Sequence, residues 1–314
     1  MIIKQENSQE PDSHNYDIAI GAVGFETRCR HIFETIPVDA PIKFGLEFGF
    51  LQEIAFNDNK KFFMDKNFHL LNGLAENSVS HLKNEVANKI ITSDTLKVLV
   101  DISSMSREMI AKVALFLREL LHEKHLRITI AYAPPSYPPT KEESPIEKAG
   151  PIIPELAGWA PDPSLPIGVV LGLGCEPGLA LGSLQRLEPS MVWAFSPIGL
   201  DIRFDALDQE ANSHIGDIFN VAHYKYDLID PTGTRVDLVR IFTTIQESHR
   251  IIAVSSGPKI FAWILIFTAL FNPFPSIGIW AFSSRQKLIA RDIHPMGEII
   301  WHNLLLNSGN GCNE

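Results

Sequence analysis

The sequence is poor in cysteine and has no long apolar run. Its 314 residues include three cysteines, Cys29, Cys175 and Cys312, whose spacing matches no metal-ligand pattern. A few unpaired thiols are typical of a reducing compartment. The longest apolar run, residues 260–271, has twelve residues, which is too short to cross a bilayer and suits a buried helix. We therefore expect a soluble, cytoplasmic protein without a metal, a cofactor or membrane contact.

An excess of positive charge is also lacking. The formal net charge is −10, so extended nucleic-acid binding is not expected, although a local basic pocket is compatible with this charge. The sequence contains no GxSxG, HExxH or GxxxxGK[ST] pattern, and it therefore lacks the common signatures of α/β-hydrolases, zinc peptidases and P-loop proteins. The amino-terminal stretch `MIIKQENSQEPDSHNYD` is polar and acidic, without the pattern of a signal peptide.

Strand-like and helix-like segments alternate along most of the chain. `YDIAIGAV`, `IKFGLEF`, `LKVLVDI` and `LRITIAYA` have the composition of buried strands, with helical patterns between them. After a proline-rich stretch the alternation starts again with `IGVVLGLG`. This order predicts an α/β protein of two tandem Rossmann-like domains with mostly parallel sheets. We expect a disordered tail at residues 1–14, domains at 15–135 and 166–304, a linker at 136–165 and a tail at 305–314. Within the linker, `PIIPEL` and Trp159 are expected to pack against a domain.

The two halves resemble each other at a shift of about 150 residues. Gly24 and Glu26 in `AVGFE` then align with Gly174 and Glu176 in `GLGCE`. With two more residues inserted, `SSMSR` (residues 103–107) aligns with `SSGPK` (residues 255–259). A repeat of this kind predicts that the halves are related by internal duplication. We also expect their carboxyl edges to share one cleft.

The repeated loops have the chemistry of an anion site. Helix amino ends carry unpaired N–H groups and a partial positive charge, and hydroxyls with a cation add to both. Glutamates near such a seat are suited to ribose hydroxyls or base amino groups, since a carboxylate repels phosphate. The predicted ligand-binding residues are Gly24, Glu26, Arg28, Asp101, Ser103, Ser104, Arg107, Gly174, Glu176, Ser255, Ser256, Gly257 and Lys259.

Structural roles are the alternative for the same side chains. Ser103 or Ser255 could cap its helix, and Glu26 could form an ion pair with Arg28 or Arg30. Glu26, Asp101 and Glu176 are also the candidates for a general acid or base. A patch of Asp201, Arg203 and Asp205 could line the same cleft or form an ion pair that orders its loop.

Two family resemblances are present in these motifs. `VVLGLGCEPGLAL` resembles the first motif of S-adenosylmethionine-dependent methyltransferases, but the next strand, `WAFSPIG`, lacks the acid that binds ribose in that family. The loop `SSGPK`, with Ser255, Gly257 and Lys259 between a strand and a helix, is similar to the signature of CARF-like domains, the Rossmann-fold nucleotide sensors of CRISPR-associated effectors. In the first half, Met105 and Arg107 replace the glycine and the lysine.

The CARF-like resemblance implies a nucleotide or oligonucleotide sensor or effector subunit, in phage defence, with the ligand held between paired domains. It also implies a partner protein or a homo-oligomer, because no effector domain follows in the sequence. Two other functions stay open. The chain could be an enzyme that cleaves a glycosidic or phosphoester bond of a nucleotide. It could instead be a protein-interaction subunit with a vestigial pocket, for which the apolar segment 260–271 is a possible surface.

Overall fold

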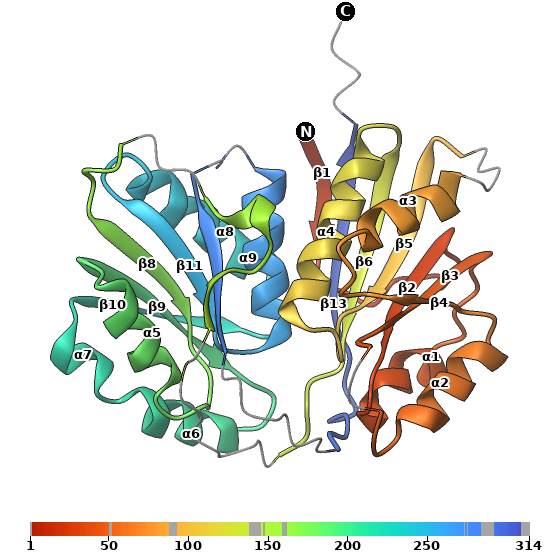
Figure 1. Cartoon of the computed structure of the whole chain (residues 1–314), viewed down its shortest axis with the longest axis horizontal. Helices are drawn as coiled ribbons and strands as arrows, with labels where there is room; N and C mark the ends of the chain where they lie inside the picture. The colour runs from red at the N-terminus through yellow and green to blue at the C-terminus, as the bar shows by residue number, and fades with distance from the viewer. Residues whose placement is uncertain are drawn as a thin grey trace, which may run out of the picture. The chain divides into compact units, whose positions relative to one another are not determined.

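The computed structural model describes residues 2–49, 52–87, 93–137, 146, 148–158, 162–272, 274, 276–283 and 292–308. The chain divides into two compact units, one of Met1–Ser136 with Ile289–Glu314 and one of Tyr137–Leu288. Each unit has a sheet of mostly parallel strands with helices on both faces (Figure 1). The predicted fold class, α/β with two Rossmann-like halves, is confirmed.

Unit 1 has a seven-stranded sheet in the order β1-β13-β6-β5-β2-β3-β4. Five consecutive parallel strands form its centre and one end: β2 (Ile18–Val23), β3 (Ile42–Glu47), β4 (His69–Asn72), β5 (Thr95–Asp101) and β6 (His125–Tyr132). β13 (Ile300–Asn307) lies antiparallel between β6 and β1 (Ile2–Asn7). Strand β2 is buried along its whole length, and β5 is buried from Val98 to Asp101, as expected for parallel strands that are covered on both faces.

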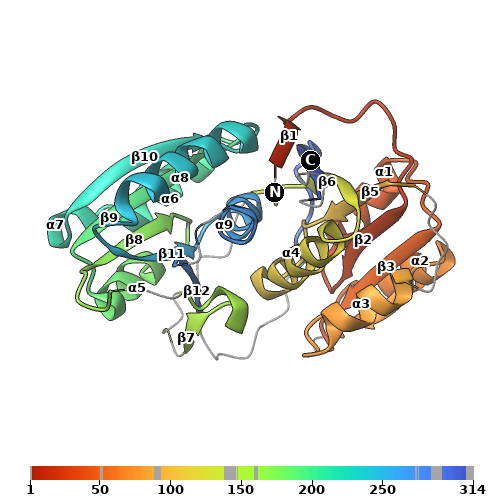
Figure 2. The same cartoon turned by 90° about the horizontal axis from the view of Figure 1, so that it is seen from above.

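Helices cover both faces of this sheet, as Figure 2 shows from above. The long helix α4 (Arg107–Leu121) packs beside α3 (Ser78–Ala87) on one face and buries Met109, Ile110 and Phe116. On the other face, α1 (His31–Thr35) and α2 (Phe56–Asp65) supply Phe33 and Phe63 to a core with Tyr16, Ala19 and Trp301. η1 (Thr27–Arg30) joins β2 to α1.

Unit 2 has a six-stranded sheet in the order β10-β9-β8-β11-β12-β7. Its strands are β7 (Lys148–Pro151), β8 (Ile167–Gly172), β9 (Met191–Ile198), β10 (Val221–Asp227), β11 (Arg250–Ser255) and β12 (Gly278–Ser283). Its helices are η2 (Pro154–Leu156), α5 (Leu179–Leu187), α6 (Arg203–Asn212), α7 (Ile215–Ile218), α8 (Pro231–Ile245) and α9 (Lys259–Phe271). The apolar segment 260–271 forms most of α9, and its side chains are almost all buried. It is therefore a buried helix, as its length predicts.

The two sheets have the same strand order. In each, the five parallel strands run fifth, fourth, first, second, third along the sheet, and an antiparallel strand borders the fifth. That bordering strand comes, in sequence, after the five parallel strands of the other unit. β7 follows the fifth strand of unit 1 but pairs with β12, whereas β13 follows the fifth strand of unit 2 but pairs with β6. The shared order agrees with internal duplication, which stays a prediction.

Several domain boundaries differ from those expected from sequence. Residues 1–14 contain β1, and residues 292–307 belong to unit 1 through β13 instead of to the second domain or a tail. The physical reason is the edge of β6. Without β13, its alternating apolar residues and backbone groups would lie at an open sheet edge. In the expected linker, Ile153 and Leu156 of `PIIPEL` are buried, while Trp159 lies outside the described residues.

Candidate functional site

Both units place their candidate residues at a topological switch point. The first parallel strand of each unit, β2 or β8, lies between the second and the fourth, so the connections after the first and the fourth parallel strands lead in opposite directions along the sheet. Loops that diverge at such a point leave a crevice at the carboxyl ends of the strands, where open α/β sheets bind ligands. In unit 1 these are the loops after β2 and β5, and in unit 2 those after β8 and β11.

In unit 1 a buried ion pair joins these loops. Arg28, which is 3% exposed, donates from Nε to Glu26 Oε2 at 2.7 Å and from a terminal nitrogen to the Ala133 carbonyl at 3.4 Å. Ser104 Oγ donates to the same Glu26 oxygen at 3.1 Å. Burial acts to lower the pKa of Arg28, but Glu26 and, more weakly, Tyr132 and Asp101 hold it above its ordinary value. The ion-pair alternative for Glu26 is therefore realised, with Arg28 as the partner.

The side chains of Asp101 and Ser103 accept hydrogen bonds from backbone N–H groups of unit 1. Asp101 Oδ1 accepts a hydrogen bond from the Ser103 N–H at 2.8 Å, and Ser103 Oγ accepts one from the Ala133 N–H at 2.8 Å. Both residues are almost completely buried. The capping alternative is wrong for Ser103, because Ser106 is the N-cap of α4 and accepts from the Met109 N–H at 3.1 Å. Arg107 is the first residue of α4.

In unit 2, two glycines allow the loops after β8 and β11 to approach each other closely. A Cβ on Gly257 would clash with the Leu173 carbonyl oxygen, and one on Gly174 would clash with the Ser256 carbonyl oxygen. No side chain fits between these backbones, so both positions require glycine. Ser255 and Ser256 are 5% and 8% exposed. The Ser255 hydroxyl makes no hydrogen bond with any residue that the structure describes.

The amino ends of helices α9 and α5 in unit 2 have no side-chain cap. Helix α9 begins at Lys259 after Pro258, and α5 begins after Gly178, which has a φ of +74°; neither capping residue accepts a hydrogen bond through its side chain. Unit 1 differs, because Ser106 occupies the amino end of α4. Helix starts without a side-chain cap, two buried serines and a lysine are groups that suit an anion. An anion site at these residues of unit 2 stays a prediction.

Acidic side chains lie around Cys175 in the loop after β8. Glu176 is exposed in the loop after β8, and Asp208 on α6 is 4% exposed. Burial, and then Asp208, Glu176 and Asp205, raise the pKa of Cys175 to about 11, so its thiol is protonated and unreactive at neutral pH. Asp201 and Arg203 form an exposed pair, with Nε and Oδ1 2.9 Å apart, and the Arg203 guanidinium lies 4.4 Å from the Tyr137 ring centroid. The ion pair expected for this patch is present, and its place in a ligand cleft stays a prediction.

Two buried asparagines were missed in the sequence. Asn59 on α2 donates to the Gly24 carbonyl at 2.9 Å and to the Glu26 carbonyl at 2.9 Å. In unit 2, Asn212 on α6 donates to the Gly174 carbonyl at 3.0 Å. Gly24 and Gly174 are the two glycines that the repeat aligns, so equivalent side chains hold equivalent loops. The 153-residue separation of the two asparagines could have indicated this, being close to that of the repeat.

The strand register matches the serines of the two units differently from the sequence alignment. Ile20 pairs with Val100 in unit 1, and Val170, which lies 150 residues after Ile20, pairs with Ala253 in unit 2. The fourth strands are therefore related by a shift of 153, since 253 − 100 = 153. Ser103 corresponds to Ser256, and Ser255 corresponds to Ile102. Aligning the two helix starts placed the serines one residue out of register because the loop before α9 is shorter than the loop before α4.

No protein-family model matches the sequence, and no curated protein matches it. A solved structure with a similar fold is described as "Structure of a Type III CRISPR defence DNA nuclease activated by cyclic oligoadenylate". The two are 8% identical with a TM-score of 0.49, over 83% of this chain and 65% of the other, so this chain spans less than two thirds of that protein's length.

Two further searches concern the described residues only. Among them, no group of three histidine, cysteine or acidic side chains is arranged to hold a metal ion. None of the helices in that part of the chain is long and apolar enough to span a membrane.

Proposed function

We propose that this protein is a nucleotide-binding or oligonucleotide-binding sensor or effector subunit whose phosphate seat lies at the switch point of unit 2. The observation that carries the proposal is the buried Ser255 hydroxyl without a hydrogen-bond partner in the described structure, beside the uncapped start of α9. A buried hydroxyl that lacks a partner carries a free-energy cost, which a bound phosphate oxygen would relieve.

A nucleotide fits this crevice better than a bare phosphate. Around the start of α9 the groups are N–H donors, serine hydroxyls and Lys259, which suit phosphate. Glu176 in the loop after β8 is exposed and acidic, and a carboxylate accepts hydrogen bonds from ribose hydroxyls or a base amino group. A ligand with an anionic part and a hydrogen-donating part complements both sides.

The unit 1 residues take a supporting role in this proposal. The Glu26 carboxylate already accepts from Arg28 and Ser104, and Asp101 is buried and accepts from its own loop. Neither is placed to act as a general base. Binding therefore fits the geometry better than cleavage with these two carboxylates. The cleft shared by the two halves stays a prediction from the sequence.

The decisive experiment is isothermal titration calorimetry of the full chain with AMP, ATP, linear oligoadenylates and cyclic oligoadenylates; the last are included because of the resemblance of the `SSGPK` loop. Lys259→Ala should weaken binding of the preferred ligand by about 1.5–3 kcal/mol, the range of a hydrogen bond to a charged group. Lys225→Ala removes an exposed lysine on β10 and is the matched control, which should bind normally. An absence of heat with every ligand would refute the proposal.

Two additional measurements separate the alternatives. Chromatography of the ligand after long incubation should return it unchanged from a sensor, whereas a cleaved ligand would identify an enzyme. Arg107→Ala reports on unit 1. A loss as large as that of Lys259→Ala would mean that both units contact the ligand, and an unchanged affinity would confine the phosphate seat to unit 2. The role we propose in the cell is in phage defence, together with a partner protein or a second copy of the chain.

A further inference from the structure

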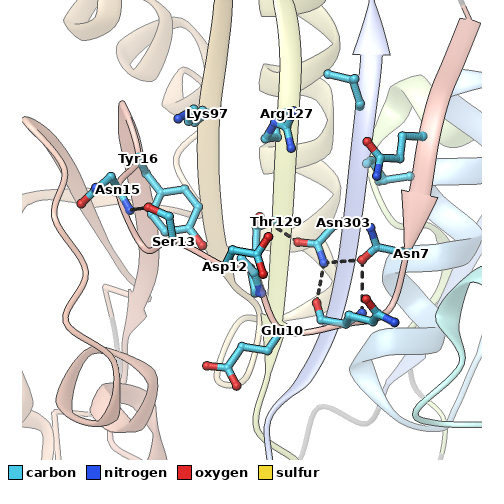
Figure 3. A pocket seen from close by; sticks show the side chains of 15 residues that line it. Asn7, Glu10, Asp12, Ser13, Asn15, Tyr16, Lys97, Arg127, Thr129 and Asn303 are labelled. Atoms are coloured by element: carbon cyan, nitrogen blue, oxygen red, sulfur yellow. Dashed lines mark hydrogen bonds between the residues drawn. The ribbon is translucent and has the colours of Figure 1, made fainter.

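A cavity of about 480 Å³ opens on one face of the unit 1 sheet (Figure 3). Its origin is topological. β1 is the edge strand and β2 is central, so the connection between them crosses β13, β6 and β5. Residues 8–17 make this crossing and form one wall, while the outward side chains of the three strands form the floor. The cavity involves none of the switch-point residues of either unit.

The floor carries two adjacent cations. Lys97 on β5 and Arg127 on β6 are register partners and are both exposed, so their strands are about 4.8 Å apart at that point. Neither has an ion-pair partner among the residues that the structure describes. Like charges directly opposite each other on a sheet repel and are destabilising. An anion bound between them would remove that repulsion.

The other end of the cavity is acidic and rich in amides. Figure 3 shows Glu10 and Asp12 at the end opposite Lys97 and Arg127, with Thr129 and Asn303 between. Asn303 is fixed in place, because it accepts from Thr129 at 2.9 Å and donates to Asn7 at 3.0 Å. The Tyr16 hydroxyl, on the cavity lining, is buried and lies close enough to Thr129 to interact with it. The carboxylates of Glu10 and Asp12 accept hydrogen bonds and therefore suit a group that donates them.

We propose that this cavity binds a small hydrophilic molecule with a phosphate or carboxylate at one end and hydroxyl or amino donors at the other. The volume lies within the range of about 300–1,000 Å³ for small-molecule sites. Tyr16 is the one aromatic residue on the lining, and it is 8% exposed. A nucleobase would therefore lack a ring on which to stack, and the site suits a sugar phosphate or an aminoalkyl phosphate.

Calorimetry at low ionic strength tests this with glucose 6-phosphate and phosphoethanolamine as probes, and with inorganic phosphate, glucose and ethanolamine as their fragments. At least one probe should bind tenfold or more tightly than phosphate. The double variant Lys97→Gln/Arg127→Gln should lose at least tenfold in affinity for that probe. Glu10→Gln/Asp12→Asn should weaken the probe but leave phosphate unchanged.

The controls keep this site separate from the switch point. Arg118→Gln removes a partly exposed cation on α4, on the opposite face of the sheet, and should bind the probe normally, as should Lys259→Ala. The proposal is overturned if neither probe binds more tightly than phosphate, or if the double cation variant keeps full affinity. A nucleotide that binds here more tightly than both probes would overturn the ligand class.

Discussion

Single buried polar residues set the shape of both switch-point loops. Asn59 is completely buried and Asn212 is 8% exposed, and each satisfies the carbonyl of a glycine in the loop after the first parallel strand of its unit. A buried carbonyl that loses its donor keeps the full cost of desolvation. We therefore expect both asparagines to contribute to the stability of the fold, although their side chains are uncharged.

Asn59→Ala and Asn212→Ala should each lower the free energy of unfolding by about 1–3 kcal/mol, because each leaves a buried carbonyl unsatisfied. Chemical denaturation of the full chain measures the change. Asn77→Ala is the control, since the Asn77 side chain donates from Nδ2 to His81 Nε2 at an exposed site, and its effect should stay within about 0.5 kcal/mol. Equal stability of all three variants would contradict the positioning role.

Asp208 should make the stability of unit 2 depend on pH. Burial raises the pKa of Asp208 to about 6, with Asp205 acting in the same direction and a hydrogen bond from Ser196 opposing it. A carboxyl that holds its proton more tightly in the folded protein contributes stability below its unfolded pKa and loses that contribution as pH rises through the folded pKa. The loss should therefore occur between about pH 4 and pH 6.

Asp208→Asn removes this titration. The variant should match the wild type near pH 4 and be more stable by about 1–3 kcal/mol at pH 7.5, where the wild-type carboxylate is ionised and buried. Denaturation midpoints at intervals between pH 4 and pH 8 give the two curves. Glu247→Gln, at an exposed position after α8, should follow the wild type throughout. A constant difference between Asp208→Asn and the wild type would rule out the buried carboxylate as the cause.

At the scale of elements, β13 decides where unit 1 ends. Its apolar residues Ile300, Leu304 and Leu306 are buried against unit 1, and it pairs with β6 along seven residue positions. β7 plays the same part for β12 in unit 2. β7 therefore covers the edge of the unit 2 sheet, and β13 covers an edge of the parallel strands of unit 1. Open edges of this kind are prone to pair with other chains.

Leu304→Ala should destabilise unit 1 in preference to unit 2. Leu304 is 1% exposed, and a leucine-to-alanine change in a core costs about 2–5 kcal/mol. Hydrogen exchange with mass spectrometry should show faster exchange in β1 and β6, with β8 and β11 unchanged. The opposite result, with faster exchange in β8 and β11, would restore the boundary expected from the sequence.

At the scale of the whole molecule, net charge limits the partners. With a formal charge of −10, the chain as a whole repels a polyanion, although a local site can still hold one short ligand. We expect no binding to long duplex DNA at about 0.15 M salt, where nonspecific affinity depends on many lysine and arginine contacts. Fluorescence anisotropy with a labelled duplex measures this. Submicromolar affinity for the duplex would contradict it.

The sequence by itself determined the fold class, the buried helix α9 and the positions of the loops after β2, β5, β8 and β11. Periodicity suffices for these because runs such as `YDIAIGAV` and `LKVLVDI` can be buried on both faces only inside a parallel sheet. The repeat in sequence also anticipated the shared strand order, since each half has its strands and helices in the same succession.

Tertiary structure alone decided which side chains satisfy one another. The Glu26–Arg28–Ser104 contacts, the Asn59 and Asn212 hydrogen bonds and the exchange of β7 and β13 all depend on which segments become neighbours in space. In the sequence alignment Ser103 of unit 1 corresponds to Ser255 of unit 2, whereas by strand register it corresponds to Ser256. A shift of one residue leaves the hydrophobic pattern of a buried parallel strand almost unchanged, so only the hydrogen-bonded ladder between neighbouring strands fixes the register.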